Sequence, residues 1–126
     1  MRILIVEDNH VNQIVLETML RKLNIETDIA HNGSQALSRL DELHKKYQTI
    51  DAIFMDCQMP IMDGFEATRN IRRSNTPYAN IPIIAVTGNV TTDDEKKCLE
   101  SGMNAIMNKP FQLDRIRQIL ASLTTA

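Results

Sequence analysis

The feature that most restricts the fold is residues 52–64, where an unbroken apolar run changes abruptly into turn-forming residues. Residues 52–55 are Ala-Ile-Phe-Met, Asp56 follows, and Pro60 and Gly64 come soon after. A short apolar run bounded by turn signals is typical of a strand buried on both faces, as in a parallel sheet. Proline and glycine favour a loop before any helix can start. The pattern predicts a carboxylate at the exposed end of a buried strand, although an aspartate there can also simply begin a turn.

Short apolar segments alternate with amphipathic helical patterns along the chain. We expect strands at residues 2–6, 25–30, 52–56, 81–86 and 105–107, and helices at 10–23, 33–43, 65–73, 92–101 and 113–123. This alternation predicts an α/β sheet with right-handed crossovers and helices on both faces. The strand at 25–30 mixes polar and apolar residues, which suits a sheet edge. The helix at 92–101 has few apolar residues, chiefly Cys98 and Leu99, as expected of either a movable element or a short surface helix.

Polar side chains follow four of the five predicted strands. These residues are Glu7 and Asp8, Asp56, Thr87 and Lys109. Because the functional crevice of an open α/β sheet lies outside the carboxyl ends of its strands, we expect these side chains to gather at one rim. Crowded carboxylates repel one another and favour a hard divalent cation, and Mg²⁺ accepts such ligands while leaving room for phosphate oxygens. With a lysine and a hydroxyl nearby, the set predicts phosphoryl transfer, and Asp56 is the best candidate nucleophile.

Four ordered motifs resemble those of the receiver domain of two-component response regulators. They are residues 6–9 (VEDN), 55–64 (MDCQMPIMDG), 86–88 (VTG) and 108–111 (NKPF). The resemblance spans essentially the whole chain, so we expect residues 1–126 to form a single receiver domain. It implies a flavodoxin-like fold, a five-stranded parallel sheet in the order 2-1-3-4-5 with helices on both faces.

The resemblance also implies roles for the site residues. Asp56 would accept a phosphoryl group from a histidine kinase or a histidine phosphotransfer domain. Asp8, Asp56 and the carbonyl of Gln58 would bind Mg²⁺, with Mn²⁺ as an alternative ion, and Glu7 would hold a metal-bound water. Gln58 and Asn89 flank the site and could set the rate at which water attacks the acyl phosphate.

Switching is expected to follow from the new phosphoryl oxygens, which would draw in Thr87 and Lys109 and move the loops and the helix at 92–101. The Lys109–Pro110 peptide bond is expected to be cis. The family usually places an aromatic residue three positions before the lysine, whereas this chain has Ile106 there. That departure affects the side-chain part of the switch and leaves the phosphorylation chemistry intact.

Residues 7–13 (EDNHVNQ) and 64–68 (GFEAT) are most similar to receivers attached to hybrid sensor histidine kinases. We therefore expect either a stand-alone regulator or, as we favour because Arg2 begins the first strand with no leader, a domain excised from a larger protein. The domain itself would be an acceptor that phosphorylates and dephosphorylates itself rather than a turnover enzyme.

Composition excludes several other classes. The 126 residues carry a net charge of −2, which argues against direct binding to nucleic acid or to an anionic membrane. Cys57 and Cys98 form no CxxC pair, which favours a reducing, cytoplasmic setting, although a parent protein could be membrane-anchored. The apolar run at 3–6 is too short to span a bilayer. Whether the face formed by residues 92–119 makes a weak homodimer is left open.

Three alternatives compete with a working receiver. A degenerate receiver that binds partners without phosphorylation is compatible with Ile106, although all five chemical residues are present. A magnesium-dependent phosphatase of the haloacid dehalogenase type also uses a strand-end aspartate, but it needs a second acid where Gln58 stands. A flavin carrier shares the expected fold, but it needs aromatic stacking, and the chain has no Trp and only two Tyr.

Overall fold

A parallel sheet forms the centre of the computed structural model. The structure describes residues 1–88 and 92–124. The expected role of Asn89 lies outside these residues. The strands are β1 (Arg2–Val6), β2 (Glu26–Ala30), β3 (Ala52–Asp56), β4 (Ile83–Thr87) and β5 (Ala105–Asn108). Their order is β2-β1-β3-β4-β5, and every pairing is parallel. The predicted flavodoxin-like topology is therefore confirmed, with the 25–30 segment at an edge.

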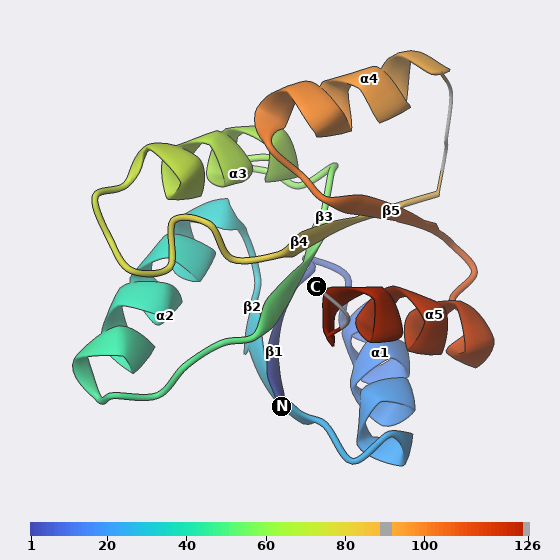
Figure 1. The fold of residues 1–126 in the computed structure, drawn as a ribbon. Coiled ribbons are helices and arrows are strands. Elements are labelled where there is room, and N and C mark those ends of the chain that lie inside the picture. The colour runs from blue at the N-terminus through green and yellow to red at the C-terminus, as the bar shows by residue number, and fades with distance from the viewer. Residues whose placement is uncertain (89–91, 125–126) are drawn as a thin grey trace.

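Helices cover both faces of this sheet (Figure 1). They are α1 (His10–Lys22), α2 (Gly33–Lys45), α3 (Gly64–Arg73), α4 (Thr92–Ser101) and α5 (Leu113–Thr124). One face carries α2, α3 and α4, and the opposite face carries α1 and α5 (Figure 1). Among the described residues, no helix combines the length and apolar character needed to cross a bilayer.

Alternate strand residues supply the two layers of the core. In β1, Leu4 packs into the α2–α3–α4 layer, whereas Ile3 and Ile5 pack into the α1–α5 layer. In β3, Ile53 and Phe54 divide in the same way, and both are fully buried. Successive side chains of a strand point to opposite faces, so a central strand covered on both faces must be apolar throughout. This explains why β3 stays apolar up to its final carboxylate.

The start of β4 and the packing of α4 differ from the sequence-based expectation, each for a physical reason. Regular pairing in β4 begins at Ile83 rather than at Ile81, because Pro82 has no N–H to donate, although its carbonyl accepts from Ile53 N at 2.9 Å. In α4, Cys98 is buried as expected, but Leu99 is 65% exposed. Residues one position apart on a helix lie about 100° apart around its axis, so only one of the two can face the sheet.

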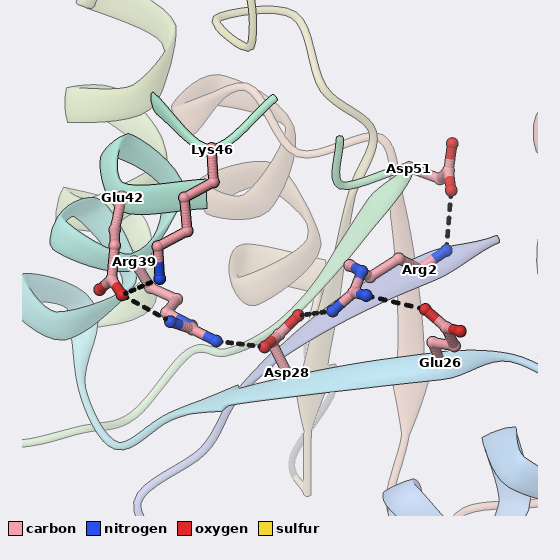
Figure 2. A network of polar contacts seen from close by, with 7 residues as sticks. All are labelled: Arg2, Glu26, Asp28, Arg39, Glu42, Lys46 and Asp51. Atoms are coloured by element: carbon pink, nitrogen blue, oxygen red, sulfur yellow. Dashed lines mark hydrogen bonds and ion pairs between the residues drawn. The ribbon is translucent and has the colours of Figure 1, made fainter. Parts of the chain in front are cut away.

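Ion pairs fasten the exposed side of β2 to its neighbours (Figure 2). Asp28 in β2 accepts from Arg2 of β1 at 2.7 Å and from Arg39 of α2 at 2.6 Å. Arg2 also donates to Glu26 at 2.8 Å. Charged side chains on an edge strand discourage pairing with another chain. This network lies apart from the strand ends that carry the candidate site residues.

Candidate functional site

Three carboxylates from two adjacent strands meet at the carboxyl edge of the sheet. Glu7 and Asp8 directly follow β1, and Asp56 is the last residue of β3. The register pairs Val6 with Met55, so the next residue of each strand lies side by side. One carboxylate oxygen of each residue lies within 4.8 Å of the others. Glu7 and Asp56 are buried, whereas Asp8 is exposed.

A side-chain cap begins each of the two helices, α1 and α3, that follow these strands. After Asp8, the Asn9 side chain caps α1 by accepting from Asn12 N at 3.1 Å. After Asp56, Asp63 caps α3 by accepting from Glu66 N. A Cβ on Gly64 would collide with the carbonyl of Asp56. The first turn of α3 can therefore pack directly against the end of β3 only because residue 64 is glycine.

The ammonium of Lys109 lies close to two of the carboxylates, although Lys109 follows the edge strand β5. Its Nζ lies 3.2 Å from Oε1 of Glu7 and 3.9 Å from Oδ2 of Asp56. Its backbone N donates to the carbonyl of Thr87 at 2.9 Å, which ties the turn after β5 to the end of β4. Thr87 is buried one register position beyond Val86, the partner of Asp56. The Lys109–Pro110 bond is cis, as expected.

Gln58 contacts the Asp56 carboxylate through its backbone. Its amide N donates to Oδ1 of Asp56 at 3.1 Å. This bond orients the carboxylate, whereas the predicted role of the Gln58 carbonyl as a metal ligand remains a prediction.

Burial and mutual proximity govern the charge of the two buried acids. Burial, and the hydrogen bond to Glu7, raise the pKa of Asp56 to about 8. Burial also opposes the ionisation of Glu7, but its hydrogen bond with Asp56 and the charge of Lys109 outweigh burial and hold the pKa of Glu7 below its usual value. In the absence of a cation, the pair therefore retains one proton at neutral pH, mainly on Asp56.

The residues fit a hard divalent cation. Oε1 of Glu7 is buried and accepts no hydrogen bond from the described residues, although Lys109 Nζ is close. A buried carboxylate oxygen without a hydrogen bond is costly, and a metal-bound water would satisfy it. All three carboxylates offer the oxygen ligands that Mg²⁺ prefers.

Gln13 holds the backbone at Glu7 in place, which the sequence alone did not reveal. It lies on the inner face of α1 with Leu16 and Leu20, where an apolar side chain would be expected. Its Nε2 donates to the carbonyl of Glu7 at 2.6 Å and lies 2.9 Å from Nδ1 of His31. A polar residue at a core position of an otherwise amphipathic helix was the signal that could have revealed it.

Ile106 stands at the position where the family usually has an aromatic residue. It is half-buried in β5 and packs against the core layer that contains Cys98 and Met103. Its carbonyl accepts from Arg115 at 3.2 Å.

Comparison with curated proteins identifies relatives among histidine kinases. The chain is 41% identical over 126 residues to the osmosensing histidine protein kinase SLN1 of Saccharomyces cerevisiae, covering 99% of this chain and 10% of that protein. It is 36% identical over 121 residues to hybrid signal transduction histidine kinase L of Dictyostelium discoideum, covering 94% of this chain and 7% of that protein. The chain thus spans about a tenth or less of the length of these relatives.

Solved structures agree with this fold. The receiver domain of the sensor histidine kinase PA1611 from Pseudomonas aeruginosa, with a magnesium ion coordinated in its active site cleft, matches with a TM-score of 0.87 at 40% identity, covering 99% of this chain and 98% of that one. The chemotaxis protein CheY4 of Vibrio cholerae matches with a TM-score of 0.86 at 23% identity, covering 97% of each chain, which shows the fold alone.

The sequence profile of the response regulator receiver domain matches residues 3–121, which is nearly the whole chain. The profile, the relatives and the parallel sheet in the order 2-1-3-4-5 agree. The chain belongs to the response regulator receiver domain family of two-component signalling.

Proposed function

We propose that Asp56 accepts a phosphoryl group from the phosphohistidine of a histidine kinase or a histidine phosphotransfer domain. The observation that carries this proposal is the convergence of three carboxylates and one ammonium at the end of the central strand β3. The backbone amide of Gln58 donates to Oδ1 of Asp56 and orients this carboxylate. A strand-end aspartate held in this way can act as a nucleophile on phosphorus.

The same cluster of carboxylates would also hold a metal ion. Asp8, Asp56 and the Gln58 carbonyl would hold Mg²⁺, and Glu7 would hold a metal-bound water. When bound, the cation neutralises charge on the transferring phosphoryl group. Oε1 of Glu7, which accepts no hydrogen bond from any described residue, supports this arrangement. Mn²⁺ has the same preference for oxygen ligands and is the alternative ion.

In the proposed transfer, an ionised oxygen of Asp56 attacks the phosphorus while the P–N bond to the imidazole breaks. The electron pair of that bond stays on the ring nitrogen, so the products are an aspartyl phosphate and a histidine side chain. Lys109 balances the negative charge beside Asp56, and the hydroxyl of Thr87 at the end of β4 donates to a phosphoryl oxygen.

The signal would leave the site through α4. Cys57, the residue after Asp56, is buried with its Sγ 4.0 Å from Sγ of Cys98 in α4. Only Cys98 and Ser101 of this helix are buried among its described residues, so the helix is held by few side chains. Movement of the strand end on phosphorylation would therefore reach α4 directly and change its surface for a partner.

We further propose that residues 1–126 form one receiver domain of a hybrid histidine kinase. The relatives named above are histidine kinases in which the matched region is a small part. A degenerate receiver remains the alternative function, which Ile106 permits. The complete set of Glu7, Asp8, Asp56 and Lys109 at one rim favours the phosphorylated form.

Phosphorylation by a small donor tests the acceptor. Incubation with acetyl phosphate and Mg²⁺ should add one acid-stable, base-labile phosphoryl group, seen by intact mass, and chelation should prevent it. Asp56→Asn should abolish the addition. Asp51→Asn is the matched control, because Asp51 precedes the opposite end of β3 and its carboxylate accepts from Arg2 N. Incorporation that persists in Asp56→Asn would refute the acceptor, and steady hydrolysis of unrelated phosphoesters would favour a phosphatase.

A further inference from the structure

Two free thiols lie against each other between the end of β3 and α4. Cys57 directly follows Asp56, and Cys98 lies in α4. Their Sγ atoms are 4.0 Å apart, and the two residues are 4% and 1% exposed. They are 41 positions apart in sequence, so only the packing of α4 against the sheet brings them together. Because the chain has no other cysteine, an internal disulfide could only join these two elements.

A disulfide between the two thiols needs only a small movement. An S–S bond is about 2.05 Å long, so the two sulfur atoms have to approach each other by about 2 Å. Among the described side chains of α4, those of Cys98 and Ser101 are buried, and the Ser101 hydroxyl donates to the Cys98 carbonyl within the same helix. A helix held by so few buried side chains can shift by this amount while the sheet beneath it stays in place.

The two thiols differ in how firmly their backbone is held. The amide of Cys57 donates to the carbonyl of Val86 at 3.2 Å, which ties this residue to β4. Cys98 lies in the helix, so local opening of α4 exposes its thiol and leaves Cys57 in the core. We therefore expect an oxidant to reach Cys98 first and Cys57 to react with it when the helix closes.

Burial protects both thiols as long as α4 is closed. It raises the pKa of the Cys57 thiol, and it also raises the pKa of the Cys98 thiol. The thiolate is the reactive form of cysteine, so a buried thiol that keeps its proton reacts slowly with an oxidant. The opening of α4 should therefore limit the rate of oxidation.

We propose that Cys57 and Cys98 form a reversible disulfide in the presence of a peroxide, and that this bond fixes α4 to the end of β3. The Cys98 thiolate attacks an oxygen of hydrogen peroxide, the O–O bond breaks, and the released hydroxide takes up a proton to form water. The Cys57 sulfur then attacks the sulfur of the Cys98 sulfenic acid, the S–O bond breaks, and the hydroxyl leaves as a second water. Two thiols are oxidised and one peroxide is reduced, and a thiol reductant reverses the change.

The disulfide would leave phosphorylation intact and block its effect on α4. The carboxylates and Lys109 come from the ends of β1, β3 and β5, so the candidate site needs no residue of α4. The helix through which the signal is proposed to leave would instead be held by a covalent bond. This part of the inference rests on the proposed function. Disulfides in reducing compartments are usually transient and regulatory, which suits a bond of this kind.

Peptide mapping tests the bond. The full chain is treated with hydrogen peroxide at pH 7, unfolded, alkylated with iodoacetamide and digested without reductant. The expected product is a peptide pair joined through Cys57 and Cys98, from a chain that stays monomeric, and dithiothreitol should restore two alkylatable thiols. The linked peptide is the readout, because the seven methionines also gain oxygen from peroxide. Cys57→Ala should instead leave Cys98 oxidised but unlinked.

Amide hydrogen exchange tests the effect on α4. In the oxidised chain the amides of α4 should exchange about tenfold or more slowly, because opening the helix now strains a covalent bond. The amides of α2, which carries no cysteine, should exchange as before. Acetyl phosphate with Mg²⁺ should change the exchange of α4 in the reduced chain but not in the oxidised chain, although Asp56 is labelled in both. Cys98→Ser measured before and after peroxide separates the disulfide from methionine oxidation.

Three results would overturn the inference. They are the absence of the linked peptide, equal exchange of α4 in the oxidised and reduced chains, and a response of α4 to acetyl phosphate that survives oxidation. Slower exchange of α4 in peroxide-treated Cys98→Ser would also overturn it, because that variant cannot form the bond. Failure of acetyl phosphate to label Asp56 in the reduced chain would instead refute the proposed function, and the linked peptide with slower exchange of α4 would still support the disulfide.

Discussion

The ammonium of Lys109 lies 3.2 Å from Oε1 of Glu7, a carboxylate that is 1% exposed. The two residues follow β5 and β1, which are separated in the sheet by β3 and β4. Asp56 lies between them at the end of β3, 3.9 Å from the same ammonium. One side chain thus connects the strand ends that carry the candidate site.

Lys109→Met should lower the free energy of unfolding by roughly 2 kcal/mol at pH 7, because the buried charge of Glu7 would lose its partner. The loss is smaller than for a fully buried pair, since the Lys109 side chain is 27% exposed. Urea denaturation measures it. Lys45→Met is the control, because Lys45 pairs with Asp41 at 2.9 Å on the exposed surface, where solvent screens the pair and it contributes little to stability. Equal losses in the two variants would contradict the prediction.

Binding of Mg²⁺ should release a proton at pH 7. Without a cation, the pKa of Asp56 is raised to about 8, so this carboxyl is mostly protonated at neutral pH, whereas a metal ligand must be ionised. The affinity for Mg²⁺ should therefore rise as the pH increases towards about 8 and then level off. Calorimetric titration in buffers of different ionisation enthalpy measures the released proton. A binding enthalpy that is independent of the buffer would contradict the assignment.

In the absence of a cation, the raised pKa of Asp56 also makes the stability of the fold depend on pH. The folded protein holds the Asp56 proton more tightly than the unfolded chain, whose ordinary value is 3.8. The contribution of the Asp56 proton to the free energy of unfolding is therefore complete below pH 3.8 and is lost as the pH rises through about 8. Asp56→Asn, which stays neutral, should remove this dependence, and urea denaturation across the pH range measures the difference.

Gln13→Met should weaken Mg²⁺ binding by about tenfold, the lower end of the effect expected when a residue that supports metal ligands is lost. The substitution keeps the side-chain volume but removes the 2.6 Å hydrogen bond to the Glu7 carbonyl, so the acidic end of β1 is held less firmly. Gln35→Met is the control, because Gln35 is exposed and its side-chain oxygen accepts from the backbone N of His31 at 2.9 Å. Titration with Mg²⁺ measures both. Equal affinities would show that Gln13 has only a packing role.

Asp28→Asn should destabilise the fold by about 1.5–3 kcal/mol at pH 7, the range for hydrogen bonds to charged groups. Burial opposes the ionisation of Asp28, but hydrogen bonds from Arg2 and Arg39 outweigh it and hold its pKa below the ordinary 3.8. Its contribution is therefore present above that value and is lost as the pH falls through the lower folded-state pKa. Chemical denaturation at several pH values measures this.

Glu26→Gln serves as the control for Asp28. Glu26 bonds to the same Arg2, but its side chain is 73% exposed, so its loss should change stability by less than about 0.5 kcal/mol. If the two substitutions cost the same, the network of Figure 2 has no buried centre at Asp28.

Prediction of the fold succeeded where the signal is local. The apolar runs of β1 and β3 carry enough information to identify buried strands, and β2 was placed at an edge because its residues alternate. The gathering of Glu7, Asp56 and Lys109 followed from one general property, that parallel strands end at the same edge. These features depend on spacing along the chain, which is visible before folding.

The sequence by itself determined the order of strands and helices, the apolar layers and the acids that end β1 and β3, because strand and helix periodicity is a property of neighbouring residues. Only the tertiary structure decided that Gln13 points inward to the Glu7 carbonyl, that Leu99 faces solvent, and that Ile61 adopts a positive φ. Each of these depends on contacts between segments distant in sequence, such as Met62 with Gly33, whose geometry no local pattern specifies.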